Sequence, residues 1–179
     1  METLTIPKEE LKALQSIMKR NKQGMREALR HLLIEDGALH ATDGKVLLRI
    51  DPEVVPAGGL VSGVWEVLKV DKTRPRLPSE VTLSRLEALQ APSLKVLLSQ
   101  KTNKSAPAPF ELPIDAEAIT RSKAIITLFD RFRKAYSYEL LGTLAPLDRS
   151  FEASLVDDRG MLRLENCKAT ALVMAFDLK

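Results

Sequence analysis

The sequence predicts an α+β protein made of two similar units, each consisting of a strand, a helix and an antiparallel three-strand meander. Two stretches with helical periodicity each follow a short apolar strand, and short strands joined by acidic turns follow each helix. In addition, "LIEDGALHATDGKVLLRI" can be laid over "LVDDRGMLRLENCKATALVMAF" with acidic turn residues in matching places. We therefore expect an internal duplication, with two pseudo-twofold-related helices packed on antiparallel sheets. A chance likeness of hydrophobic patterns is the alternative.

The first unit is expected to cover about residues 1–71. Residues 2–6 read as a strand, and Pro7 suits the start of a helix that ends near Arg20. Asp36-Gly37 and Asp43-Gly44 are pairs that tolerate positive φ, which predicts two tight hairpin turns between three strands. A further strand is expected at 64–71.

The second unit is expected to cover about residues 110–179, with a strand at 110–114 and a long helix from Asp115 to about Ala135. Four strands should follow, within 136–142, 150–158, 160–166 and 170–178.

Residues 72–109 between the units read as an insertion. Ser79 could cap a short helix to about Leu89, residues 94–100 could form a strand, and 101–109 have the composition of a mobile loop. The whole chain, 1–179, is expected to form a single domain.

Composition supports one soluble globular domain, because 179 residues with 45% hydrophobic and 28% charged content suit a single core. The net charge of +3 is too small to indicate nucleic-acid binding without a suitable placement of the charges. Cys167, the single cysteine, permits no intramolecular disulfide and is expected to be a small buried hydrophobe. The apolar runs are too short to span a bilayer, so we expect a cytoplasmic protein.

Both predicted helices carry basic residues on the side away from their apolar residues. These candidate DNA-binding residues are Lys8, Lys12 and Lys19 in the first helix, and Lys123, Arg131 and Lys134 in the second. If the helices lie side by side, they form a positive surface that attracts phosphates without reading bases. Ordinary solvated helix faces are the alternative, because lysine is a favoured helix former there.

Few residues suggest catalysis. The paired acids Glu35-Asp36 and Asp157-Asp158 fall at equivalent hairpin turns, where aspartate is favoured for its backbone preferences. His31 and His40 have no third histidine or cysteine to complete a metal site. No phosphate-binding loop, nucleophile elbow or dinucleotide fingerprint is present. We therefore expect neither an enzyme nor a bound metal or cofactor.

Two segments resemble a known family. The stretch "LHATDGKVLLRID", residues 39–51, resembles the segment of the bacterial DNA sliding clamp, the beta subunit of the replicative polymerase, that contains Ala-Thr-Asp-Gly-His-Arg-Leu. The last strand, "ALVMAFDL", resembles the clamp ending Val-Met-Pro-Met-Arg-Leu. The resemblance implies a DNA-clamp-like fold, in which paired strand-helix-meander units turn their helices toward DNA.

The resemblance also implies a groove that binds linear peptides. The residues that match its segments are Thr42, Asp43, Gly44 and Leu47 in the first, and Val173, Met174, Phe176 and Leu178 in the second. Lys45 and Val46 replace the His-Arg pair, Ala175 replaces proline and Asp177 replaces arginine, which puts the choice of peptide in doubt. In the family the two segments come from different domains of a three-domain chain. Here they are expected to meet only across a subunit contact, or not at all.

These features support the hypothesis of a non-enzymatic, clamp-like DNA-binding protein. Its expected partners are double-stranded DNA, bound without sequence specificity, and polymerase or other replication proteins bound through linear peptides. Six domains form a clamp ring of this family, so a one-domain chain would need six copies to close a ring, or would act as an open, smaller relative. We expect a homo-oligomer. The alternative is a protein-binding scaffold that has the fold but does not bind DNA.

Overall fold

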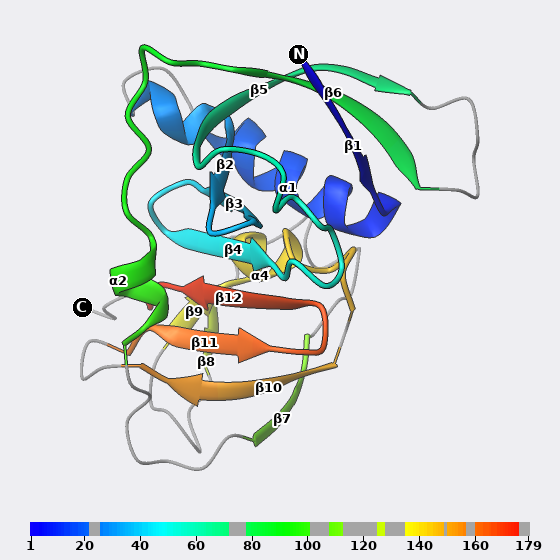
Figure 1. Cartoon of the computed structure of the whole chain (residues 1–179). Coiled ribbons are helices and arrows are strands. Elements are labelled where there is room, and N and C mark those ends of the chain that lie inside the picture. Colours follow the sequence, from blue (N-terminus) through cyan, green and yellow to red (C-terminus); the bar gives the residue numbers. More distant parts are fainter. Residues whose placement is uncertain are drawn as a thin grey trace.

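The computed structural model describes residues 1–21, 26–71, 78–100, 108–112, 125–127, 135–148, 150–156 and 160–175. Ten of its strands form one antiparallel sheet (Figure 1). In chain order these strands are β1 (Glu2–Ile6), β2 (Leu32–Glu35), β3 (Ala38–Thr42), β4 (Val46–Ile50), β5 (Gly63–Asp71), β6 (Ser79–Arg85), β7 (Ala108–Glu111), β10 (Ser150–Leu155), β11 (Leu162–Glu165) and β12 (Ala169–Val173). The order across the sheet is β1-β6-β5-β2-β3-β4-β12-β11-β10-β7.

The centre of the sheet joins two meanders. The strands β2, β3 and β4 lie beside β12, β11 and β10, so the last strand of one meander pairs with the last strand of the other. Leu47 lies opposite Leu172 and Leu48 opposite Ala171 in this antiparallel pair. This arrangement is the one that a twofold axis between β4 and β12 produces, and it confirms the predicted α+β architecture built on antiparallel strands.

The predicted first helix is confirmed as α1 (Lys8–Arg20), which begins after Pro7 and has Glu9 and Glu10 in its first turn. Acidic residues there and basic residues in the last turn complement the helix dipole. Leu11, Leu14 and Ile17 are buried against the sheet, where α1 packs on β3 and β4. A short 3₁₀ helix, η1 (Glu27–Arg30), precedes β2.

Both predicted turns of the first meander are present. Asp36 and Gly37 have φ values of 51° and 76°, as a tight hairpin turn with two left-handed residues requires. Gly44, in the second turn, has a φ of 83°. A side chain with a β-carbon would be strained at such a value.

The prediction of a long helix from Asp115 to about Ala135 is wrong in the part of that segment that the structure describes. Residues Ile125–Thr127 form a strand, β8, which pairs with β9 (Ala135–Ser137) in a separate two-stranded sheet. Two isoleucines and a threonine favour a strand because their branched β-carbons restrict helical rotamers. The rest of this predicted helix, including Lys123, Arg131 and Lys134, lies outside the described residues.

The segment expected to be a strand at 136–142 is also different. Only its first two residues belong to β9, and the chain then forms the short helix α4 (Tyr138–Gly142). Leu140, Leu141 and Leu144 are buried there, because a helical turn followed by tight turns directs all three into the same core.

The predicted structure of the insertion is wrong at two elements. Residues expected to form a helix from Ser79 belong to β6, whose Val81 and Leu83 are buried while Glu80 is exposed. That alternation is typical of a strand, and β6 fills the sheet between β1 and β5. The expected strand at 94–100 instead contains the short helix α2 (Lys95–Leu98). Leu94 and Leu98 are four residues apart, so a helical turn directs both onto the sheet.

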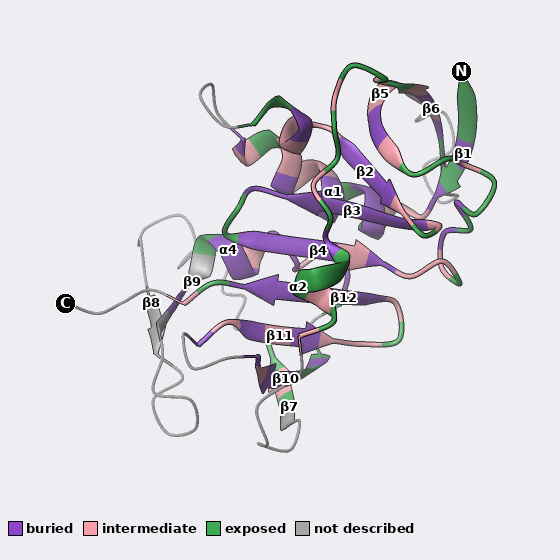
Figure 2. Ribbon diagram, turned by 60° about the vertical axis from the view of Figure 1, so that its left-hand side comes forward, coloured by how far each residue is buried: buried purple, intermediate pink, exposed green. Residues whose placement is uncertain are grey.

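The two faces of the sheet have separate apolar cores. The larger core includes Leu14, Ala41, Leu48 and Ala171 on the α1 side, and it spans both meanders. The smaller includes Leu33, Leu47 and Leu172, covered by Leu94 and Leu98. Consecutive strand residues alternate between the faces, so α1 and α2 lie on opposite sides of the sheet (Figure 1). Figure 2 shows the buried residues concentrated in the central strands and the exposed surface of α2.

Cys167 is exposed, contrary to the prediction of burial. It lies in the turn between β11 and β12, where the Asn166 side-chain oxygen accepts hydrogen bonds from the Lys168 and Ala169 amides at 2.9 Å. These bonds turn the chain at its edge and leave the cysteine facing solvent. None of the helices in the described ranges combines the length and the apolar composition that a membrane span requires.

Candidate functional site

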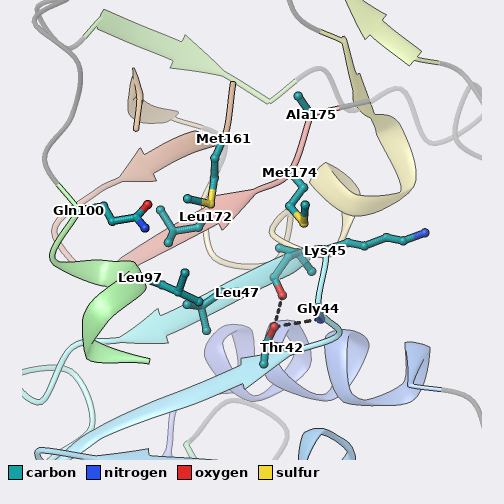
Figure 3. A pocket seen from close by; sticks show the side chains of 11 residues that line it. Thr42, Gly44, Lys45, Leu47, Leu97, Gln100, Met161, Leu172, Met174 and Ala175 are labelled. Atoms are coloured by element: carbon teal, nitrogen blue, oxygen red, sulfur yellow. Dashed lines mark hydrogen bonds between the residues drawn. The ribbon is translucent and has the colours of Figure 1, made fainter. Parts of the chain in front are cut away.

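A cavity of about 300 Å³ lies at the junction of β4 and β12, on the α2 face of the sheet (Figure 3). One wall is the β3–β4 hairpin, and the other is the end of β12 with Met161 and α2. The lining residues are Thr42, Gly44, Lys45, Val46, Leu47, Leu97, Gln100, Met161, Leu172, Met174 and Ala175. Most of these are apolar, and two are methionines, whose flexible side chains adapt to differently shaped partners.

The hairpin wall is held in one conformation by its own side chains. The Asp43 carboxylate is 5% exposed, and its Oδ1 accepts hydrogen bonds from the amides of Lys45 at 2.9 Å and Val46 at 2.8 Å. The Thr42 hydroxyl donates to the Val46 carbonyl at 2.8 Å and accepts from the Gly44 amide at 3.1 Å (Figure 3). The turn that forms this wall of the cavity is therefore pre-organised.

The end of α1 anchors this turn from the opposite face. Arg20 Nε donates to Asp43 Oδ2 at 2.8 Å, and Arg20 Nη1 also pairs with Glu139 of α4. Asn21 Nδ2 donates to the Thr42 carbonyl at 2.9 Å. Burial on its own lowers the pKa of Arg20, but the hydrogen bonds to Asp43 and Glu139 outweigh it and raise that pKa above its usual value. Arg20 is charged at any physiological pH. It therefore links Asp43 of the hairpin to Glu139 of α4, which belongs to the second unit.

The structure brings together four of the predicted peptide-binding residues. Thr42, Gly44, Leu47 and Met174 all line the cavity. The Met174 amide donates to the Lys45 carbonyl at 2.8 Å, which continues the pairing of β4 with β12. The expectation that the two segments meet only across a subunit contact, or not at all, is wrong, because the sheet joins them within one chain.

The other predicted residues of this set do not line the cavity. Asp43 lies beneath the turn, and Val173 is fully buried in the core on the α1 side, one residue out of phase with Leu172. Phe176 and Leu178 lie outside the described residues. Strand alternation could have indicated Leu172 in place of Val173, because residues two apart in a strand, such as Leu172 and Met174, share a face.

Leu97, Gln100 and Met161 were missed by the sequence analysis. Leu97 and Gln100 come from the segment of α2, which was predicted to be a strand, so no contact with the hairpin could be inferred. Leu97 is 40% exposed, which leaves an apolar surface at the mouth of the cavity.

The predicted basic stripe is present on α1, on the side of the sheet away from the cavity. Lys12 and Lys19 are exposed and Lys8 is partly exposed, while Leu11, Leu14 and Ile17 of the same helix are buried. A negatively charged partner that binds to this stripe would therefore not compete for the cavity.

The described residues that line the cavity form no catalytic constellation, because none of them is an aspartate, glutamate, histidine or cysteine. Among the described residues no group of three or more such side chains could hold a metal ion. What the arrangement can do is bind apolar side chains between two preformed walls.

Solved structures with a similar arrangement are bacterial clamps. A Helicobacter pylori beta clamp with a DNA ligase peptide bound aligns with 98% of this chain at a TM-score of 0.59 and 13% identity. The DNA polymerase III beta subunit of Pseudomonas aeruginosa aligns with 99% at a TM-score of 0.57 and 14% identity. The beta sliding clamp of C. crescentus aligns with 99% at a TM-score of 0.59 and 10% identity.

The chain has the bacterial sliding-clamp fold. The alignments cover 66% to 67% of the lengths of these three clamps, so the chain spans about two thirds of each. No protein-family model and no curated protein matches the sequence. At 10% to 14% sequence identity, the similarity to these structures is a similarity of fold. The two segments whose sequences resemble the clamp family lie side by side in this fold, as the paired strands β4 and β12 and the turn before β4.

Proposed function

We propose that this protein is a non-enzymatic, clamp-like tether whose cavity at the β4–β12 junction, the peptide groove, binds a linear segment of a partner protein. The observation that carries the proposal is the meeting of the Thr42–Leu47 hairpin with Leu172 and Met174 in one apolar cavity. The Helicobacter clamp with a similar fold has been solved with a DNA ligase peptide bound.

Binding would rest on a few apolar anchors. A buried leucine- or phenylalanine-sized side chain contributes roughly 1.5–3 kcal/mol, and two or three of them must offset the entropy lost by the peptide. We expect a dissociation constant in about the micromolar range for a short peptide. The rigid hairpin helps, since no ordering of that wall is required on binding.

The test is fluorescence anisotropy with the DNA ligase peptide known from the Helicobacter clamp, and a scrambled version of it, as probes. Met174→Glu places a charge in the groove and should weaken binding at least about tenfold. Leu68→Glu is the matched control, because Leu68 on β5 is 45% exposed and Met174 is 50% exposed. The proposal that the groove recognises side chains would be contradicted if Met174→Glu and Leu68→Glu bound the peptide equally well. It would also be contradicted if the scrambled peptide bound as well as the DNA ligase peptide.

We further propose that the basic stripe of α1 makes exchangeable contacts with the phosphates of double-stranded DNA. Lys12→Glu combined with Lys19→Glu should abolish DNA binding, and the wild-type affinity should fall steeply as salt rises. The control is Lys69→Glu with Arg85→Glu, which reverses two exposed charges on β5 and β6.

A scaffold that binds proteins but not DNA is the second candidate. The small net charge of +3 and the exposed Glu9 beside the stripe favour it. Peptide binding without any salt-dependent DNA binding would establish it. The native mass in solution tests the related proposal of a homo-oligomer, since a stable hexamer supports a closed ring and a monomer contradicts it.

A further inference from the structure

A second hollow, of about 280 Å³, opens on the same face of the sheet as the peptide groove. The segment of α2 lies between the two, because Leu97 and Gln100 line the groove while Leu98 and Ser99 line the hollow. The floor of the hollow is polar. His40, Arg49 and Thr170 are successive partners across β3, β4 and β12, so they form one row.

The carboxylates at this hollow already have partners. Glu35 accepts hydrogen bonds from the Leu94 amide at 3.1 Å and the Ser93 hydroxyl at 3.4 Å. Asp36 pairs with Lys95 at 3.2 Å, and both of those side chains are largely exposed. The acceptors at the hollow are therefore engaged in holding α2.

The two arginines that line the hollow, Arg49 and Arg163, have N–H donors that are not used in hydrogen bonds to described residues. Arg163 Nη1 donates to the Leu98 carbonyl at 3.0 Å and Nη2 to Glu165 at 2.7 Å. Arg163 Nε is buried and has no hydrogen-bond partner among the described residues. Arg49 pairs with Asp51 through Nη1. A guanidinium has five N–H donors, so these contacts use only part of the supply of the two arginines.

His40 is the most deeply buried polar side chain of the hollow, at 2% exposure. Its Nδ1 also lacks a hydrogen-bond partner within the described part of the chain. Burial, helped by the charge of Arg49, lowers the pKa of His40 to about 4, so the ring is neutral at pH 7. The charged groups that surround it are Glu35 from the end of β2, Asp36 from the β2–β3 turn, Arg49 from β4, Lys95 from α2 and Arg163 from β11.

We propose that this hollow is a binding site for a small oxyanion, the phosphate or carboxylate group of a small molecule, held by Arg49 and Arg163 above the His40–Thr170 row. An oxyanion supplies several acceptors and no competing donor, which is what the unpartnered Nε of Arg163 and the spare donors of Arg49 require. Protonation of His40 would give the anion a further donor. The proposal does not depend on the peptide groove.

Calorimetric titration in chloride buffer tests the site with inorganic phosphate, sulfate and acetate as separate probes. We expect saturable binding with one site per chain. The probe that binds with the higher affinity shows whether the site prefers a phosphate-like anion or a carboxylate. Arg163→Gln and Arg49→Gln should each weaken binding at least about tenfold. Lys69→Gln removes an exposed positive charge on β5 and should bind as the wild type does.

Nuclear magnetic resonance of the wild-type protein gives a second readout that needs no variant. Sulfate should raise the pKa of His40 by about 1 or more, because a nearby anion favours the charged ring. His31, the other histidine of the chain, is the internal control and should be unaffected. Absence of saturation by all three probes, or equal shifts at both histidines, would overturn the proposal. Met174→Glu should leave anion binding intact, which separates this site from the groove.

Discussion

At the scale of single residues, Asp43 determines the shape of the groove. Its carboxylate accepts two backbone amide bonds and one bond from Arg20 while almost fully buried. Asp43→Ala leaves those donors without a partner and should lower the free energy of unfolding by roughly 2–4 kcal/mol. Urea denaturation measures this. Glu53→Ala, at an exposed site, is the control and should change little; an equal effect would contradict the anchoring role of Asp43.

His40 makes stability depend on pH. Its folded-state pKa of about 4 lies below the ordinary value of 6.5, so the unfolded chain takes up the proton first as the pH falls. The stability contributed by the neutral ring is complete above about pH 6.5 and declines by roughly 1.4 kcal/mol per pH unit as the pH falls toward 4. His40→Gln should flatten this decline in denaturation curves between pH 7 and pH 4, whereas His31→Gln should not.

Residue patterns predicted the groove only in part. Thr42, Gly44, Leu47 and Met174 could be named because two short segments of the sequence resemble segments of the bacterial sliding clamp. The sequence does not record which strands pair, so it could not show that both segments meet within one chain. Leu97 and Arg163 reach their sites through tertiary packing of distant segments, for which no local pattern exists.

At the scale of elements, predictions held where local signals agreed. Strand β1, helix α1 and the first meander combine a clear period with strong start and turn residues. The strand β6 was missed because Ser79 resembles a helix cap, while burial between β1 and β5 decides its conformation. The helix α2 was missed because its apolar run is too short for the spacing of apolar residues to distinguish a helix from a strand.

The attachment of α2 can be tested through Glu35, which bonds to Ser93 and Leu94 immediately before the helix. Glu35→Ala should speed hydrogen exchange of the Leu98 and Ser99 amides, which bond to Leu94 and Lys95. Peptide affinity should fall about threefold to tenfold, since Leu97 loses its fixed place. Glu66→Ala on β5 is the control. Unchanged exchange in Glu35→Ala would show that apolar packing alone holds α2.

At the scale of the whole molecule, the two meanders should unfold together, because one sheet and one core span both. Trp65, the only tryptophan, is buried in β5, which pairs with β2 of the first meander, whereas Cys167 lies between β11 and β12 of the second. Tryptophan fluorescence and a polarity-sensitive dye on Cys167 should therefore give the same urea midpoint. Two separate midpoints would show that the halves fold independently.

The pairing of β4 with β12 also has a consequence for synthesis. The hairpin that forms one wall of the groove leaves the ribosome before Leu172 and Met174 do, because it precedes them by most of the chain described here. An unfinished or half-folded copy thus has no complete groove to offer. If the groove recruits a partner as proposed, only molecules in which β4 and β12 have already paired can do so.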